Sequence, residues 1–328
     1  MATESIGSTT SHYVPDVLGG EFVARELALA SSAREAEIVA TLIRLGTPTR
    51  KTGVLYLHGF SDYFFQAHHA QYWAERGYDF YALDLRRYGR SLRPHQHAGE
   101  TRDLTEYHEE VARAIAIMRE EGHDRIVLLG HSTGGLIATL FAQHHPGAID
   151  VLVLNSPWYD INDSPLKRRI SAPLASLVAL RSPDCQIARI PGVYTESIHA
   201  STGGAWDFDL TLKPLAGFPV RAAWLSAIRR AQREVNGGLN LRMPVLLCTS
   251  TRSGGTGGKR ATPVQLRTTD TVLDVRHMWH AATRIGPDVT IRTVPGGLHD
   301  LALSAPAARE DYETAVTTWL ERRLGTPQ

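Results

Sequence analysis

The segment Gly130-His131-Ser132-Thr133-Gly134 holds the residues of this chain best suited to chemistry. It follows the apolar run 126–129 and precedes the apolar segment 135–141, so the order is strand, Gly-x-Ser-x-Gly, helix. Such a turn exposes the serine hydroxyl and needs glycine where a Cβ would collide with the neighbouring strand or helix. The first N–H groups of the helix point to the same place, where negative charge develops in acyl transfer. The pattern predicts Ser132 as a nucleophile.

A serine nucleophile needs a base, and the base needs a carboxylate that orients it. In sheets of this kind the chain order is serine, acid, histidine. His299 follows the last predicted strand behind two glycines, which let the chain turn back across the sheet edge, so we expect it to be the base. Asp270 and Asp274 both lie where the acid is expected. We prefer Asp270, because Asp274 falls in the first turn of a predicted helix, where a carboxylate complements the helix dipole.

The negative charge that forms during acyl transfer needs backbone N–H donors. Thr133, next to the nucleophile, supplies one, and Phe60, in the loop after the strand 53–57, is expected to supply the other. The side chain of Phe60 then remains available to line a pocket for the acyl or alcohol group. His58 lies in the same loop, and we interpret it as a structural residue rather than a base or a metal ligand.

The rest of the chain alternates short apolar runs with helical patterns. Strands are predicted at 21–29, 36–45, 53–57, 79–83, 125–129, 150–154, 245–249 and 289–294, and helices at 65–76, 104–121, 134–144, 272–285 and 307–323. Near-continuous apolar runs are typical of parallel strands that are buried on both faces. The alternation therefore predicts an α/β fold, with a mostly parallel eight-stranded sheet and helices on both faces.

The alternation of strands and helices is interrupted between the sixth and seventh predicted strands, in a stretch rich in proline, arginine and aromatic residues. Helix-like pieces fall near 165–180 and 219–235. Because the chain enters and leaves this stretch at strand ends, where loops build active sites, we interpret residues 157–242 as a cap. Residues 1–156 and 243–328 then form the two parts of the core domain. A second independent domain is the alternative.

The predicted cap is more basic than the whole chain. It carries eleven Lys and Arg against seven Asp and Glu, an excess of +4, whereas the chain as a whole has a net charge of +1. A solvated surface would explain this excess. Alternatively, one of the arginines binds an anionic group of the substrate, and the adjacent pairs Arg168-Arg169 and Arg229-Arg230 rank first. We also expect His131 and Trp158 to contact the substrate.

Composition excludes several classes of protein. A chain that is 43% hydrophobic and 21% charged, with almost balanced charges, is an ordinary globular composition that calls for no nucleic-acid partner. No apolar run is long enough for stable membrane insertion, and no secretory signal is evident, so a cytoplasmic location is expected.

The two cysteines, Cys185 and Cys248, fit neither a disulfide framework nor a zinc site. The glycine-rich loop 253–259 lacks the spacing of a phosphate-binding loop, so no cofactor or metal is expected. Nothing in the sequence specifies an oligomeric state.

Taken together, His58-Gly59, the segment Gly130–Gly134, Asp270 and Gly297-Leu298-His299 resemble the α/β-hydrolase superfamily. The segment Asp84–Ser91 is similar to the D-x-R-G-x-G-x-S motif of its capped branch of monoacylglycerol lipases and lysophospholipases, but Arg87 stands where that motif has glycine. If that glycine holds a left-handed backbone, either Arg87 tolerates the strain or the turn differs. The resemblance implies the α/β-hydrolase fold and a cofactor-free serine hydrolase that acts on a small-molecule carboxylic ester.

Several alternatives stay open at this point. Monoesters that keep a free carboxylate, such as monoalkyl phthalates, would suit the basic cap. An aminopeptidase would need an acidic anchor for the amino terminus of its substrate, for which the candidates are Asp160, Asp163, Glu196, Asp207 and Asp209. Haloalkane dehalogenases and epoxide hydrolases use an aspartate nucleophile, so Ser132 argues against both. A non-catalytic small-molecule receptor on the same fold is the alternative outside enzymes.

Overall fold

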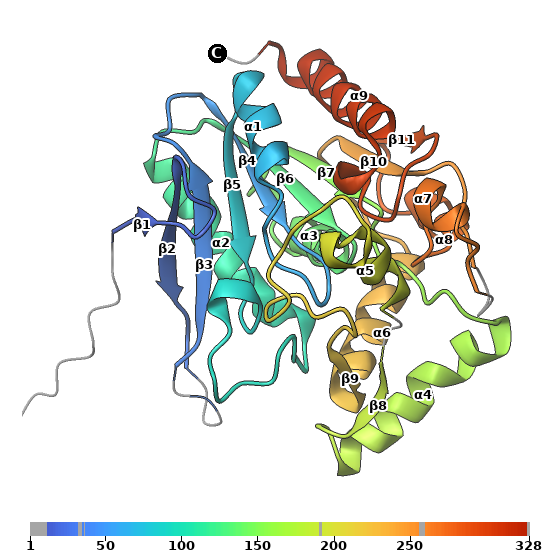
Figure 1. The fold of residues 1–328 in the computed structure, drawn as a ribbon. Helices are drawn as coiled ribbons and strands as arrows, with labels where there is room; N and C mark the ends of the chain where they lie inside the picture. Colours follow the sequence, from blue (N-terminus) through green and yellow to red (C-terminus); the bar gives the residue numbers. More distant parts are fainter. Residues whose placement is uncertain (1–11, 32–34, 36, 190–191, 256–259, 327–328) are drawn as a thin grey trace, which may run out of the picture.

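A nine-stranded sheet forms the centre of the computed structural model, which describes residues 12–31, 35, 37–189, 192–255 and 260–326 (Figure 1). The strand order is β1-β2-β3-β5-β4-β6-β7-β10-β11. The bounds are β1 Val14–Pro15, β2 Phe22–Ala28, β3 Val39–Leu45, β4 Thr52–Leu57, β5 Asp79–Asp84, β6 Arg125–His131, β7 Val151–Asn155, β10 Val245–Ser250 and β11 Val289–Val294. Strands β5, β4, β6, β7, β10 and β11 pair in parallel, whereas β1, β2 and β3 join the edge in antiparallel pairing.

The predicted mostly parallel sheet is confirmed, with one addition. All eight predicted strands are present, and the short strand Val14–Pro15 extends the antiparallel edge by pairing with β2. Two residues are too few to form an alternating pattern, so the sequence carries no signal for this strand.

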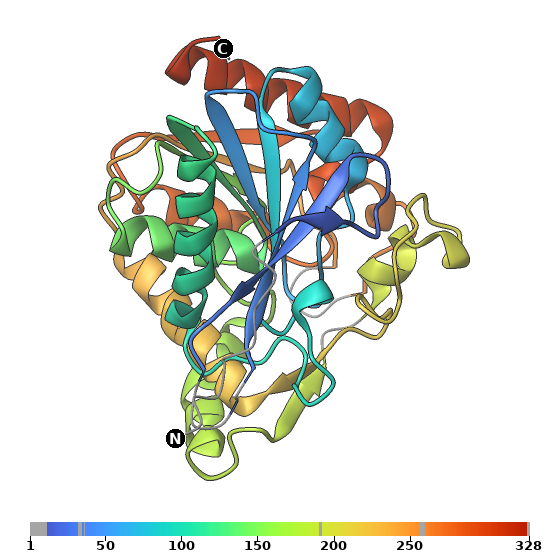
Figure 2. The same cartoon turned by 90° about the vertical axis from the view of Figure 1, so that its left-hand side faces the viewer.

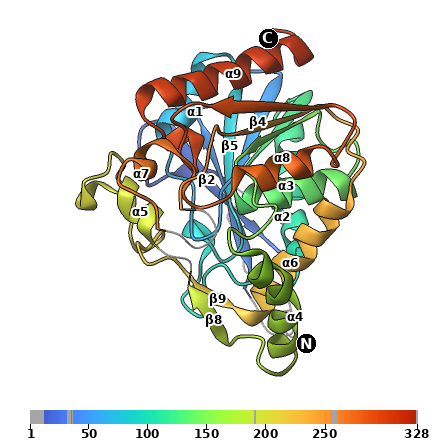
Figure 3. The same cartoon turned by 90° about the vertical axis from the view of Figure 1, so that its right-hand side faces the viewer.

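Helices cover both faces of the sheet (Figures 2 and 3). In β4, Tyr56 belongs to the apolar layer that contains Trp73 and Tyr312, whereas Leu55 belongs to the layer that contains Leu136. This alternation follows from the two-residue period of a strand, and it explains why a continuous apolar run fits a strand that is covered twice. The first layer holds α1 Ala67–Glu75 and α9 Pro306–Leu324, and the second holds α2 His108–Glu120, α3 Thr133–His144 and α8 Val275–Ala282.

The insertion, which we define as residues 157–242, lies between β7 and β10 in the chain. It contains α4 Pro165–Arg181, β8 Gln186–Arg189, α5 Val193–Ile198, β9 Pro219–Arg221 and α6 Ala222–Gly237. Strands β8 and β9 form a separate two-stranded sheet, which the sequence did not predict, and together with α4 they lie away from the central sheet (Figure 1). The two predicted helical pieces correspond to α4 and α6. Helix α4 exposes several large apolar side chains, namely Leu166, Ile170, Leu174, Leu177 and Leu180.

Candidate active site

Ser132 stands at the turn between β6 and α3 in a strained conformation. Its φ of 52° and ψ of −116° lie in a region that costs a residue with a side chain about 1–3 kcal/mol. Two backbone hydrogen bonds hold it there, because Ser132 N–H donates to Asn155 O at 3.0 Å and Trp158 N–H donates to Ser132 O at 2.9 Å. A Cβ on Gly134 would lie 2.4 Å from Leu57 O, and one on Gly130 would lie 2.6 Å from Gly134 O. Both glycines are therefore required for the close approach of strand and helix.

His299 joins Ser132 to Asp270. Its Nε2 lies 3.0 Å from Ser132 Oγ, and its Nδ1 lies 2.9 Å from Asp270 Oδ2. A carboxylate can only accept, so Nδ1 is the protonated nitrogen, and Nε2 is left as the acceptor for the serine proton. All three side chains are buried, and Asp270 is completely enclosed. The arrangement can remove a proton from Ser132 and stabilise the resulting imidazolium.

The structure separates the two candidate acids. The Oδ1 atom of Asp270 accepts the N–H groups of Val272 at 2.9 Å and Leu273 at 2.8 Å, which leaves Oδ2 for the histidine. Asp274 instead caps α8 by accepting the backbone N–H of Arg276, and its carboxylate also pairs with the guanidinium of Arg276. The structure thus brings Asp270, not Asp274, to His299. Of the glycine-rich loop that precedes them, residues 256–259 lie outside the described part of the chain.

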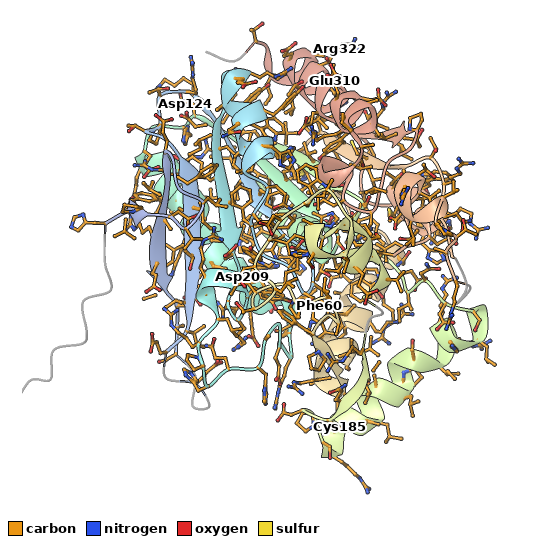
Figure 4. The ribbon with its side chains drawn as sticks, in the orientation of Figure 1. Phe60, Asp124, Cys185, Asp209, Glu310 and Arg322 are labelled. Atoms are coloured by element: carbon orange, nitrogen blue, oxygen red, sulfur yellow. The ribbon has the colours of Figure 1, made fainter. Side chains whose placement is uncertain are left out.

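Phe60 and Thr133, whose N–H groups were expected to bind the oxyanion, line the same pocket as Ser132. Thr133 is the first residue of α3, and Phe60 lies in the loop after β4. Within the described residues, neither N–H donates to a protein acceptor, so both are available to an oxyanion. The side chain of Phe60 packs against Trp224 of α6, with ring centroids 4.1 Å apart, and so lies between the sheet and the insertion (Figure 4).

His58 uses both ring nitrogens within the protein. Its Nδ1 lies 2.8 Å from Gly59 O and therefore donates to it, while its Nε2 accepts the N–H of Leu85 at 3.1 Å. With both nitrogens occupied and the ring buried, His58 fixes the loop that carries Phe60. This geometry fits the structural role expected for it.

Arg87 adopts the left-handed conformation that its place in the motif implied. Its φ is 66°. The guanidinium is held by Glu35 and by Glu106 at 3.1 Å, and it also donates to Glu100 O at 3.0 Å. These partly buried contacts offset the backbone cost of roughly 1 kcal/mol that a non-glycine residue carries there.

A pocket of about 590 Å³ opens above Ser132. Apolar side chains from the sheet loops and from the insertion dominate its lining, namely Phe60, Trp158, Ile161, Ile170, Leu174, Val220, Trp224, Leu225, Val272 and Leu273. Ser132, His299, His131 and Thr133 line the same pocket, so the expected contacts of His131 and Trp158 are possible.

The four arginines ranked first as anion ligands do not line this pocket. Arg168 and Arg229 both pair with Asp160, the latter at 2.6 Å. Burial alone would raise the pKa of Asp160, but these two guanidinium groups hold it below its usual value. Arg169 is exposed, and Arg230 donates to Arg102 O on the surface. One arginine of each adjacent pair points inward, as expected for neighbours on a helix. These two residues, Arg168 and Arg229, bind the carboxylate of Asp160 and not the pocket. The cations that line the pocket are Lys167, Arg189 and Lys213.

A buried polar network behind the triad was not predicted. Asn155 Nδ2 donates to Asp300 Oδ1 at 2.8 Å, and Gln66 Nε2 donates to Asp300 Oδ2 at 3.1 Å. The backbone carbonyl of Asn155 also accepts the N–H of Ser132, so one residue connects the nucleophile turn with the loop of His299. The position of Asp300 directly after His299 was the available signal, whereas Gln66 and Asn155 follow no motif.

Comparisons with known proteins identify the family and the fold of the chain. A family model described as serine aminopeptidase, S33, matches residues 48–254. Monoacylglycerol lipase of Mycolicibacterium smegmatis is 30% identical over 158 residues, which cover 46% of this chain and 51% of that protein. Epoxide hydrolase 4 of Mus musculus is 35% identical over 106 residues, 32% of this chain and 28% of that protein. The chain thus spans about half, or less, of the length of these curated relatives.

A solved structure shares the fold. A soluble variant of monoglyceride lipase from Saccharomyces cerevisiae, in complex with a substrate analogue, superposes with a TM-score of 0.65 at 15% identity, covering 94% of this chain and 99% of that one. Across the described residues, no helix has the length and apolarity to cross a membrane, and no group of three or more His, Cys, Asp and Glu side chains is arranged to hold a metal ion. The family match covers well over half of the chain, and the chain therefore belongs to the serine aminopeptidase S33 family of hydrolases with the α/β-hydrolase fold.

Proposed function

We propose that this protein hydrolyses carboxylic esters through an acyl-enzyme formed on Ser132. The observation that carries the proposal is the pair of hydrogen bonds of His299, at 3.0 Å to Ser132 Oγ and 2.9 Å to Asp270 Oδ2. The relationship to a monoacylglycerol lipase adds support, because that protein's name specifies an ester substrate.

The mechanism follows from these contacts. Ser132 Oγ attacks the ester carbonyl carbon while its proton moves to His299 Nε2, and Asp270 stabilises the imidazolium. The backbone N–H groups of Phe60 and Thr133 bind the oxyanion, and each such donor contributes about 3–4 kcal/mol to the transition state. The carbon–oxygen bond to the alcohol then breaks, and the alcohol takes the proton from His299. A water molecule, deprotonated by His299, attacks the acyl carbon, and Ser132 leaves with the returned proton.

The insertion would act as a cap in this mechanism. We propose that residues 157–242 form a cap between core segments 1–156 and 243–328, because α4, α6 and β9 contribute apolar lining to the pocket above Ser132. A pocket of about 590 Å³ with mainly apolar lining suits the hydrocarbon part of an ester.

Other substrates find less support in the pocket. An amino terminus or a free carboxylate would need an unpaired opposite charge. Both carboxylates of the pocket are paired, Asp62 with Lys213 at 2.6 Å and Asp163 with Lys167 at 3.2 Å. The remaining cation of the lining, Arg189, is exposed, donates to Gly217 O and has no carboxylate partner among the described residues, so a free carboxylate could meet only a solvated charge there. Epoxide hydrolase chemistry would need an aspartate where Ser132 stands, and a passive receptor would not need the strained serine turn.

The proposal is tested with a fluorophosphonate probe and an ester assay. The wild-type protein should be labelled, and Ser132→Ala should lose both the label and ester turnover, with kcat reduced on the order of 10⁶-fold. Ser61→Ala is a matched control, because Ser61 lines the same pocket but its Oγ accepts the N–H of Phe218. It should keep the label. A wild-type protein that is neither labelled nor active on any ester would contradict the proposal, and so would near-wild-type turnover by Ser132→Ala.

A further inference from the structure

The core of the protein fixes the loop after β4, residues 58–64, at its two ends. At the start of the loop, the ring of His58 holds the chain through both of its nitrogens. At the end, Phe64 N–H donates to Asp84 Oδ1 at 2.8 Å. Between these ends, residues 60–62 make no backbone hydrogen bond to the core within the described part of the chain. The middle of the loop, which carries the proposed oxyanion donor, therefore depends on other contacts.

The insertion supplies these contacts from one segment, residues 209–218, which we call the clasp. Three successive residues of the loop each accept a hydrogen bond from it: Ser61 Oγ accepts the N–H of Phe218 at 3.0 Å, Asp62 Oδ1 the ammonium of Lys213 at 2.6 Å, and Tyr63 Oη the N–H of Asp209 at 2.9 Å. The ring of Phe60 also packs against that of Phe218, with centroids 5.9 Å apart. Four successive residues of the loop thus contact the clasp, and Figure 4 labels Phe60 and Asp209 among them.

The ion pair is the strongest of these contacts. Lys213 and Asp62 are only 5% and 3% exposed, and the ammonium group also lies over the rings of Phe65 and Phe208, at 5.0 and 5.3 Å from their centroids. Separating such a pair leaves an uncompensated buried charge, which is strongly unfavourable. Ser61 has a φ of 54°, a conformation that a residue with a side chain keeps only where its surroundings fix it. The clasp thus holds the loop in a conformation that the loop would not keep alone.

We infer that the clasp positions the backbone N–H of Phe60 for the oxyanion. The inference rests on the proposed function, in which this N–H binds the negative charge on the carbonyl oxygen of the ester. A donor of this kind is effective only when it lies about 2.7–3.1 Å from the place of the oxyanion, so a small displacement of the loop removes much of its effect. The insertion therefore lowers the barrier of the reaction, in addition to lining the pocket.

Tyr63 is the sharpest position for a test, because its hydroxyl binds the clasp but its side chain does not line the pocket. Tyr63→Phe removes only the acceptor for the N–H of Asp209. It should lower kcat for p-nitrophenyl butyrate by about 3- to 10-fold, the effect of one hydrogen bond, and leave KM within about 2-fold. The matched control is Tyr159→Phe, because the Tyr159 hydroxyl also joins the insertion to the core, 2.7 Å from Thr139 Oγ1, but away from the loop. It should keep kcat within about 2-fold.

A double variant tests the ion pair. Asp62→Asn/Lys213→Met leaves no buried charge, and the asparagine can still accept the N–H of Tyr63 that Asp62 Oδ1 accepts at 3.0 Å. Losing a charged hydrogen bond should lower kcat/KM by about 10- to 100-fold, below the limit of about 10²–10³-fold for the loss of a whole oxyanion donor. The control is Arg102→Met/Asp184→Asn, which removes another ion pair between core and insertion, at 2.8 Å, and should change kcat/KM by less than about 2-fold.

Two inhibitors separate positioning of the donor from a change in the shape of the pocket. Ser132 Oγ adds to the carbonyl carbon of 1,1,1-trifluorodecan-2-one while its proton passes to His299 Nε2, and the carbonyl oxygen becomes an oxyanion. The alcohol 1,1,1-trifluorodecan-2-ol has the same skeleton but cannot form this adduct. In the clasp variants the Ki of the ketone should rise by the factor by which kcat/KM falls, while the Ki of the alcohol stays within about 2-fold. Equal weakening of both inhibitors would overturn the inference.

The outcomes separate the two proposals. A wild-type protein that neither labels with the fluorophosphonate nor hydrolyses the ester overturns the proposed function, and the clasp with it. An active wild type overturns the clasp alone if the folded Tyr63→Phe and double variants keep wild-type kcat/KM, or if the controls lose as much. Circular dichroism and a urea titration establish folding. If the double variant does not fold, Tyr63→Phe and the two inhibitors decide.

Discussion

Replacing Asp270 with asparagine should abolish most turnover, although the two side chains have the same size and shape. In the native protein Oδ1 accepts two backbone N–H groups, from Val272 and Leu273, so the oxygen of the new amide must occupy that place. The amide nitrogen then faces His299 Nδ1, where Oδ2 lies at 2.9 Å. An NH₂ group can only donate there, so Nδ1 becomes an acceptor and the ring proton moves to Nε2. His299 would then present a hydrogen to Ser132 and could not take its proton.

The magnitude follows from this change of tautomer. An aspartate-to-asparagine change of the same kind in a serine triad lowers kcat by about 10⁴-fold, which corresponds to about 5 kcal/mol in the barrier. The assay is the kcat for p-nitrophenyl butyrate, together with the rate of fluorophosphonate labelling, which should fall as well because both need a deprotonated Ser132. Circular dichroism and a urea titration establish that the variant is folded.

Asp274→Asn is the matched control for this prediction. Asp274 caps α8 and pairs with Arg276, whose side chain is 73% exposed. Asparagine is nearly as good an N-cap as aspartate, and the pair is weakened by the exposure of Arg276 although Asp274 itself is buried, so stability should change by less than about 1 kcal/mol and kcat by less than about 2-fold. The reasoning is refuted if folded Asp270→Asn retains kcat within about 10-fold of the wild type, or if Asp274→Asn is the variant that loses it.

Two further predictions concern stability. The backbone of Arg87 has a φ of 66°, so the Arg87→Gly variant should be more stable than the Arg87→Ala variant by about 1 kcal/mol. Both variants lose the ion pairs with Glu35 and Glu106, so the comparison isolates the backbone effect. Urea unfolding measures the difference, and equal stability of the two variants would contradict the prediction. At His108, burial and then the neighbouring histidines lower the pKa from 6.5 to about 4. The unfolded chain therefore binds this proton first as the pH falls, so stability present above pH 6.5 should be lost between pH 6.5 and 4, by at most about 3 kcal/mol from this group. His108→Gln should flatten the dependence of the urea midpoint on pH over this interval, and an unchanged slope would count against it.

The strands of the sheet and the candidate site residues Ser132 and His299 could be predicted because their signals are local. Each buried strand is a short apolar run, and Ser132 and His299 both follow such runs with glycines beside them. The acid was a choice between two aspartates four residues apart, and it depended on where α8 begins. Asp274 is the N-cap residue of that helix, so its carboxylate is occupied there and Asp270 is left for His299.

The pairing of the buried charges could not be predicted, because the partners are distant in the sequence. Lys213 meets Asp62 across 151 positions, and Arg229 meets Asp160 across 69. The excess of basic residues in the insertion favoured an anionic substrate as long as the arginines were counted without their partners. Arg168 and Arg229 share the carboxylate of Asp160, and Lys213 pairs with Asp62, so these cations are neutralised within the protein rather than by a ligand. A net charge counted over a segment thus says little about the ligand of a buried site, where the unpaired atoms rather than the total charge determine what can bind.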